Sequence, residues 1–193
     1  MTPRGRRVLG GLLAASVLLA LVQGPAPAGN GTDLLSTLKP GHWIQAEGLI
    51  QSDSTSTCDE LRILTGDFLD DDWALRGYLV AVDTLKREAV IGGIRFQATD
   101  NTAFDSPKPS FRRFADLRKG MLMEIEGTYL KHRRFLALEV DDESDERGNP
   151  PWPQNRIRVV ARVERLDFQR RIVTSMGFVF QLTDKTRIRS VIE

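Results

Sequence analysis

The chain has 193 residues, and its 27 Lys and Arg against 26 Asp and Glu leave a formal net charge of +1. That length suits one or two small domains. The single cysteine, Cys58, excludes an internal disulfide, so the stability of the fold must come from its packed core. We expect Cys58 to be buried and inert, the alternative being an intermolecular bridge.

The N-terminus shows the three-part pattern of a secretory signal peptide. Arginines within residues 4–7 precede an apolar run at 8–22, and Ala-Pro-Ala at 26–28 places small residues where a signal peptidase cuts. The run is short for a spanning helix, which needs about 20 residues, although a retained anchor is the alternative. We predict cleavage of residues 1–28. The remaining 165 residues (193 − 28) carry a net charge of −2 without the three leader arginines, and we expect them to be periplasmic or secreted, with no transmembrane anchor.

Two pairs of segments repeat along the chain. GIRFQATDNT at 93–102 returns as GFVFQLTDKT at 177–186, an offset of 84 with six of ten residues identical. LKPGHWIQAEG at 38–48 resembles LRKGMLMEIEG at 117–127, at an offset of 79. Because the two offsets nearly agree, a unit of about 80 residues is present twice, which predicts two tandem small domains.

The periodicity inside the unit is that of strands, since apolar residues alternate with polar ones. In this phase Phe96 and Phe180 point to the core rather than to a ligand. We expect charged turns at 84–88 and 130–134 and a short helix at 111–118. The alternating segments are 94–98, 121–125, 136–140 and 157–163.

The resulting order is three strands, a short helix and two strands, as in an OB-type barrel of five strands. The chain resembles the exported bacterial OB-like domains of unknown function, which are found in tandem behind signal peptides. The resemblance rests on the pattern G-x-x-F-Q-x-T-D-x-T, a Leu-x-x-Gly turn and an alternating run that ends in Glu-Gly. The resemblance covers most of 38–64, 75–140 and 157–188. It implies an all-β fold of two OB-like five-stranded barrels with short helices, and an exported location. It supplies no active site.

The chain begins and ends in the middle of the repeated unit, which leaves two arrangements open. In the first, residues 75–140 form a complete barrel, while 32–64 join 155–193 in a second barrel. In the alternative, the barrels are 32–104 and 111–193. An acidic N-terminal part and a basic C-terminal part slightly favour the first arrangement. The acidic and Pro-rich residues 141–154 are the expected linker.

The sequence offers no pattern for catalysis. Its two histidines, His42 and His132, occupy non-equivalent repeat positions, and no ligand spacing for zinc exists. Asp141, Glu143 and Asp145 are spaced as in a calcium loop but lack the required Gly and Glu. We therefore expect no enzyme activity, no catalytic residue, no metal and no cofactor.

Two surfaces are candidates for binding. In OB barrels, ligands bind over strands two and three, between the loops that join strands one and two and strands four and five. In the complete barrel both loops are basic, and we expect them to share one rim that attracts polyanions. Trp43 and Leu122, at equivalent repeat positions, are expected to be exposed and to form an interface between the two barrels, the alternative being a platform for a ligand. The residues of the expected rim are Lys86, Arg87, Lys131, His132, Arg133 and Arg134.

These observations favour an exported, non-enzymatic binding or interaction module, whose basic rim recognises an anionic envelope component. The expected partner is a polyanion or an envelope protein. Because of the exported location, chromosomal nucleic acid is not expected. Two alternatives remain open: a structural partner domain of an envelope protein complex, and an unrecognised hydrolase.

Overall fold

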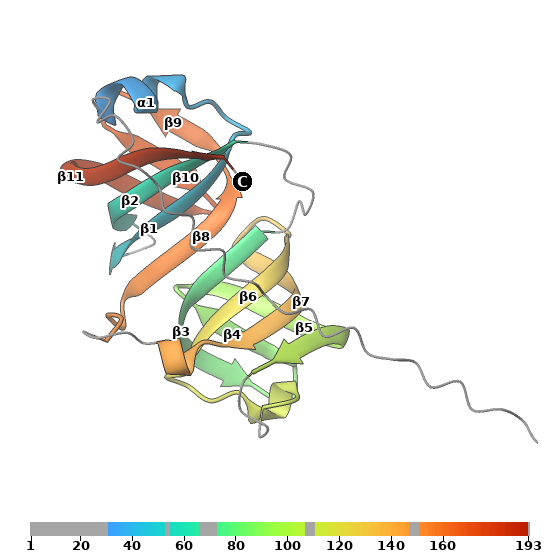
Figure 1. Cartoon of the computed structure of the whole chain (residues 1–193). Helices are drawn as coiled ribbons and strands as arrows, with labels where there is room; N and C mark the ends of the chain where they lie inside the picture. Colours follow the sequence, from blue (N-terminus) through green and yellow to red (C-terminus); the bar gives the residue numbers. More distant parts are fainter. Residues whose placement is uncertain (1–30, 53–54, 66–72, 107–110, 147–150, 193) are drawn as a thin grey trace, which may run out of the picture.

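The computed structural model describes residues 31–52, 55–65, 73–106, 111–146 and 151–192 (Figure 1). The expected signal peptide and part of the expected linker lie outside these ranges. The described chain is nearly all β-structure, as the alternation of apolar residues predicts. In chain order the elements are α1 (Gly31–Thr37), β1 (Trp43–Ser52), β2 (Thr55–Thr65), β3 (Trp73–Asp83), β4 (Glu88–Ile91), β5 (Ile94–Asp105), η1 (Phe114–Asp116), β6 (Leu122–Tyr129), β7 (Arg134–Asp142), η2 (Ser144–Glu146), β8 (Arg156–Arg162), β9 (Arg165–Asp167), β10 (Ile172–Ser175) and β11 (Phe178–Ile192).

The helix expected at 111–118 is only one 3₁₀ turn, η1. The carboxylate of Asp116 accepts hydrogen bonds from the backbone N–H groups of Arg112 and Arg113 at 3.0 and 3.1 Å. These bonds cap the start of the turn, and the helix ends after one turn because the backbone at Leu117 is already extended. Phe114 and Leu117 are nevertheless both buried, as the predicted common face requires.

Five strands close into a barrel at the lower end of the molecule in Figure 1. β3 pairs with β4 on one edge and with β6 on the other, and the circuit runs β3, β4, β5, β7, β6. β5 and β7 pair in parallel, whereas the other neighbours are antiparallel. Closure leaves these strands without open edges, which protects them from pairing with another chain.

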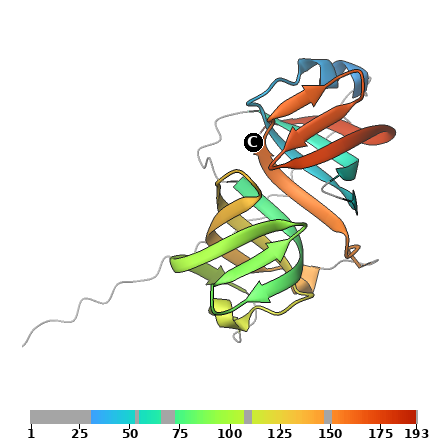
Figure 2. The ribbon, with the colours of Figure 1, turned by 180° about the vertical axis from the view of Figure 1, so that it is seen from behind.

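The other six strands lie in the order β8, β1, β2, β11, β10, β9 at the upper end (Figures 1 and 2). Their one parallel pair is β2 with β11. β8 ends at Arg162 and β9 begins at Arg165, so the row starts and finishes on successive pieces of one chain segment. β8 also pairs with β3, and this pairing joins the six strands to the barrel.

The Glu-Gly ending of one repeated word marks a close approach of two backbones. A Cβ atom at Gly48 would lie 2.2 Å from the Thr57 carbonyl oxygen, and one at Gly127 would lie 2.2 Å from that of Leu136. At both glycines the strand register shifts, between Glu47 and Gly48 and between Glu126 and Gly127. Glycine is required here because no side chain fits into the bulge.

The other repeated word, T-D-x-T, forms a hydrogen-bonded turn, which we call the Thr latch. In β5, Thr102 accepts a bond from the Thr99 N–H at 2.8 Å and donates one to the Ala137 carbonyl at 2.8 Å. In β11, Thr186 accepts from the Thr183 N–H at 2.8 Å and donates to the Cys58 carbonyl at 2.7 Å. Each latch lies where the strand skips register against its parallel partner.

The core lies between the inward faces of the strands. Phe96 and Phe180 are fully buried, which confirms the prediction that they pack in the core. Phe135 and Phe178 are as deeply enclosed. Full burial of such a side chain contributes about 1.5–3 kcal/mol, so the apolar alternation accounts for the positions of the strands.

Candidate functional site

The loop between β6 and β7 has an unusual backbone. Lys131, His132 and Arg133 have φ angles of 68°, 49° and 60°, in the left-handed region that side chains disfavour. The loop is closed by a bond from the Arg134 N–H to the Lys131 carbonyl at 3.0 Å. Lys131, His132 and Arg134 are exposed, whereas Arg133 is half-buried. Arg133 thus differs in burial from the other three basic residues of this loop.

Arg87, on the turn between β3 and β4, is engaged within its own barrel. Its guanidinium donates to the Asp100 carboxylate and to the Thr99 carbonyl. Arg171 makes the same two bonds, to Asp184 and Thr183, at the equivalent place of the repeat. Arg87 and Arg171 therefore stabilise the Thr latches in β5 and β11, respectively. The neighbouring Lys86 is exposed, with Asp83 at 3.7 Å.

The two basic turns flank opposite edges of β5. The Arg87 carbonyl accepts a bond from Ala98, and the Arg133 carbonyl accepts one from Arg95, at 3.0 and 2.9 Å. Arg87 leads into β4 and Arg133 into β7, the two neighbours of β5. Three residues along a strand span about 10 Å. The six residues of the expected rim thus lie in two groups beside β5. Lys86 and Arg87 are at its β4 edge, and residues 131–134 are at its β7 edge.

Arg133 lies between two glycine turns. A Cβ atom at Gly93 would lie 3.2 Å from its Nη1, and one at Gly177 would lie 3.4 Å from its Cγ. Its guanidinium carbon is 6.0 Å from the centre of the Phe178 ring. Among the described residues Arg133 has no ion-pair partner, and its Nη2 atom is buried without a hydrogen bond. A buried donor left unpaired costs about 1–3 kcal/mol or more when it is charged, so this group is suited to an anionic ligand.

Arg133 lines a pocket of about 380 Å³ at the junction of the barrel and the other strands. The volume falls within the range of about 300–1,000 Å³ that small-molecule sites have. Sequence reasoning named only one of the lining residues, because the pocket unites segments far apart in the chain. Its lining consists of Ile50, Tyr78, Val80, Ile91, Gly92, Gly93, Arg133, Gln154, Asn155 and Arg156.

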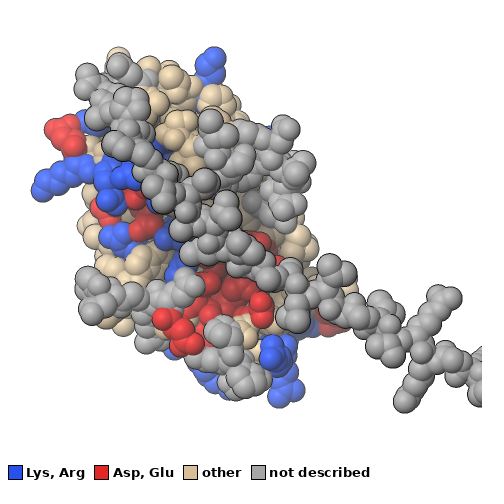
Figure 3. All heavy atoms as spheres, in the orientation of Figure 1, with Lys and Arg blue, Asp and Glu red and all other residues tan. Residues whose placement is uncertain are grey.

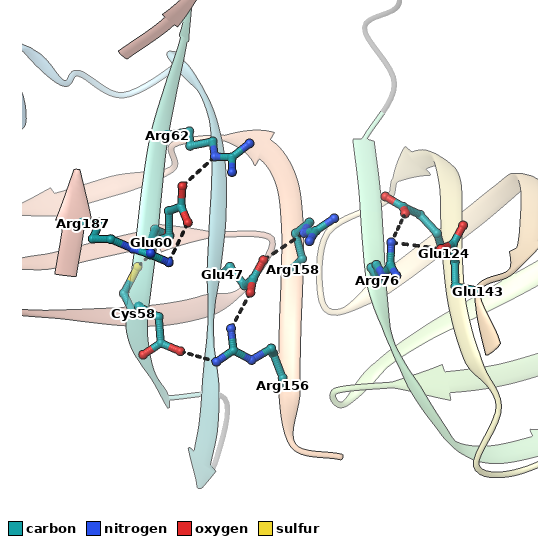
Figure 4. Close-up of polar contacts among 11 residues, drawn as sticks. Glu47, Cys58, Glu60, Arg62, Arg76, Glu124, Glu143, Arg156, Arg158 and Arg187 are labelled. Atoms are coloured by element: carbon teal, nitrogen blue, oxygen red, sulfur yellow. Dashed lines mark hydrogen bonds and ion pairs between the residues drawn. The ribbon is translucent and has the colours of Figure 1, made fainter. Parts of the chain in front are cut away.

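The second arginine of the pocket, Arg156, is neutralised. It donates to the carboxylate of Glu47 and, at 2.8 Å, to that of Asp59 (Figure 4). Arg158 also donates to Glu47, at 3.0 Å. The pocket thus contains one arginine with two carboxylate partners and one, Arg133, with none among the described residues.

A row of charged residues crosses the outer face of eight strands, parts of which appear in Figure 4. Each member is the register partner of the next, so the row has two basic and two acidic stretches. Strand alternation predicts outward charges, but the order of strands, and with it the row, cannot be derived from one strand alone. In order the residues are Arg187, Glu60, Glu47, Arg158, Arg76, Glu124, Asp141 and Asp105.

Trp152 covers the middle of this row. Arg76 and Arg158, which are like-charged register partners, lie 5.2 and 5.8 Å from the centre of its ring. Its carbonyl accepts a hydrogen bond from the Tyr78 hydroxyl at 3.0 Å. Part of the expected solvated linker is therefore packed against β3 and β8.

The acidic end of the row gathers carboxylates over β6 and β7, visible as a red area in Figure 3. Ligand oxygens of Asp105, Glu139 and Asp141 lie within 4.8 Å of one another. Burial, and then the negative charge of neighbours led by Glu139, raises the pKa of Asp141 to about 7. Carboxylate oxygens suit Ca²⁺ or Mg²⁺, but such clusters are common without an ion. Glu143 of the calcium-like spacing bonds Arg76 instead, at 3.0 Å.

Trp43 and Leu122 are not exposed, contrary to the expectation from strand phase. Leu122 is fully buried. Trp43 is covered because its ring lies 5.6 Å from that of Trp73 on β3, and Arg162 lies over it at 5.1 Å. The ring of Trp73 also packs against that of Tyr129, with 5.4 Å between the ring centres. These rings join β1 to the closed barrel, and an interface between two barrels stays a prediction.

Residues 76–141 match the model of a family described as a domain of unknown function, DUF5666. The match covers most of the closed barrel. No curated protein and no solved structure was found to match the chain. Within the described ranges, no helix is long and apolar enough to cross a membrane.

Proposed function

We propose that the chain is an exported, non-enzymatic binding module that recognises an anionic envelope component through the basic loop at 130–134. One observation carries this proposal. Arg133 is half-buried beside a pocket, and within the described chain its charge has no carboxylate partner. A guanidinium in that position binds a carboxylate, sulfate or phosphate group by charge-assisted hydrogen bonds.

The proposal includes two OB-like barrels, 75–140 and 32–64 plus 155–193, formed by the internal repeat. Its support is the correspondence of local features. The parallel pair β5–β7 corresponds to β2–β11, the Gly127 bulge to the Gly48 bulge, and one Thr latch to the other. In OB barrels the loop between strands four and five borders the ligand, and residues 130–133 occupy that loop.

The test is retention of the chain without residues 1–28 on heparin in a salt gradient, beside the variants K131E/R134E and R133M. Because polyanion affinity falls with salt for each basic contact removed, we expect both variants to elute at lower salt. R170Q is the control, since Arg170 is an exposed arginine on the turn between β9 and β10, outside the basic loop. Arg87 is left intact because it supports a latch.

Equal elution of all variants and of R170Q would mean that no particular basic residue recognises the polyanion. If the parent protein is not retained at low salt, recognition of polyanions is excluded. The structural partner domain then becomes the better hypothesis, and the measurement to follow is the search for a protein complex in the envelope.

A further inference from the structure

We propose that the pocket beside Arg133 holds the acyl chain of an anionic amphiphile, whose single acidic group pairs with that arginine. This inference rests on the proposed function, because it assumes that the basic loop recognises an anion. It adds the chemical class of the ligand, which is a monoanionic head on an unbranched apolar chain. Free fatty acids and acidic lysophospholipids both have this chemistry.

The charge of the pocket favours one acidic group. Arg156 already has two partners, Glu47 on β1 and Asp59 on β2, which lie outside the closed barrel. Arg133 is the lining arginine without one among the described residues. A polyphosphate or a multiply charged sugar would require several unpaired cations at close range. One carboxylate or phosphate diester balances the guanidinium charge of Arg133 and leaves no negative charge unpaired.

The rest of the lining favours an apolar chain. Ile50, Val80 and Ile91 are aliphatic, and Gly92 and Gly93 present a wall without side chains. Val80 is 49% exposed, an apolar surface that a bound chain would cover. Burial of apolar surface contributes about 25 cal/mol per Å². The affinity of a homologous series should therefore increase with the length of the chain.

The pocket is shared between two parts of the fold. Tyr78, Val80 and Arg133 belong to the closed barrel, whereas Ile50 lies on β1 and Asn155 directly precedes β8. A ligand that contacts both parts stabilises their junction, because it binds only when the pocket is assembled. Binding should thus raise the unfolding temperature as well as release heat.

The experiment is calorimetric titration of delipidated protein with octanoate, decanoate and dodecanoate below their micellar concentrations. Dodecanol and dodecylammonium are the uncharged and cationic controls. We expect affinity to rise along the series, dodecanoate to raise the unfolding temperature, and both controls to bind at least about tenfold more weakly. The loss of one charge-assisted hydrogen bond should reduce dodecanoate affinity about 10- to 100-fold in R133M, while R170Q leaves it unchanged. V80D, which places a negative charge on the partly exposed wall, should also weaken binding.

Equal binding of dodecanol, or equal affinity of R133M and the parent, would overturn the pairing with Arg133. Absence of binding by every chain length overturns the inference, and if heparin is still retained through the basic loop, the proposed function stands without it. Conversely, dodecanoate binding without heparin retention supports the pocket as a lipid site and excludes a polyanion as the ligand. Lysophosphatidylglycerol identifies the source, since preference for it over dodecanoate indicates a phospholipid, and the reverse preference a free fatty acid.

Discussion

The thiol of Cys58 lies in the core on β2, where it donates a hydrogen bond to the Glu60 carbonyl at 3.3 Å. Burial raises its pKa to about 12. Because the thiolate is the reactive form, we predict that iodoacetamide at pH 8 labels Cys58 only after unfolding. Mass spectrometry measures this, with S190C as the control that adds one exposed thiol. Labelling of Cys58 in the folded parent protein as fast as the added thiol of that variant would contradict the burial.

Asp141 predicts an unusual pH dependence of stability. Its pKa is about 7 in the folded chain, raised by burial and neighbouring carboxylates, against 3.8 for an ordinary aspartate. The folded state thus keeps a proton that the unfolded state has released, so this group's contribution to stability is lost as pH rises from about 4 through about 7. D141N should be more stable than the parent at pH 8 and nearly equal at pH 4. Thermal unfolding at both values tests this, with D145N as control; a parallel pH dependence of D141N and parent would exclude the assignment.

At the scale of single residues, sequence reasoning placed core positions well and surface environments poorly. Alternation assigned Phe96 and Phe180 to the interior correctly. It assigned Trp43 to an exposed face, because phase within one strand does not reveal that Trp73 covers that face. The unpaired state of Arg133 among the described residues could not be predicted either. It depends on left-handed backbone angles that the sequence Lys-His-Arg does not indicate.

The strands depend on the Thr latches at their register skips. Thr102 is buried and makes two hydrogen bonds, whereas the Asp100 side chain is 96% exposed. We predict that T102V lowers the free energy of unfolding by about 1–3 kcal/mol, because it leaves a buried carbonyl unpaired. D100N should cost less than about 1 kcal/mol, as exposed ion pairs do. Urea unfolding measures both.

The second latch provides the matched pair T186V and D184N. The same ranking is expected there, because both threonines bond the carbonyl of a strand that runs parallel to their own. If the aspartate variants prove more destabilising than the threonine variants, the ion pair and not the hydroxyl holds the skip.

Strand positions followed from the sequence because alternation reports one buried face. The bulges did not follow, although the repeated Glu-Gly words marked them, because the need for glycine comes from a backbone on a neighbouring strand. The helix expected at 111–118 was too long because the turn begins only after Arg113 and the backbone is already extended at Leu117, which the spacing of Phe114 and Leu117 does not reveal.

At the scale of the whole molecule, Trp152 connects the barrel to the other strands by covering two arginines of like charge. We predict that W152A lowers the free energy of unfolding by about 1–2 kcal/mol, as expected for partly desolvated cation–π contacts. High salt should reduce this loss, because it screens the repulsion between the arginines. W152F retains a ring and serves as the control; an equal loss in W152F would show that the ring contact is not the cause. Denaturant unfolding at two salt concentrations gives the answer.

The pairing of β1 with β8 has a consequence for how the chain acquires its structure. Trp43 finds its partner Arg162 only after the whole barrel at 73–142 has been made. During synthesis the barrel can close on local contacts. The outer edges of β1 and β2 stay unpaired until β8 and β11 have been synthesised. Vectorial folding thus begins with the closed barrel and ends when β1 and β2 pair with β8 and β11, so two strands that are synthesised early are among the last to gain protection from aggregation or proteolysis.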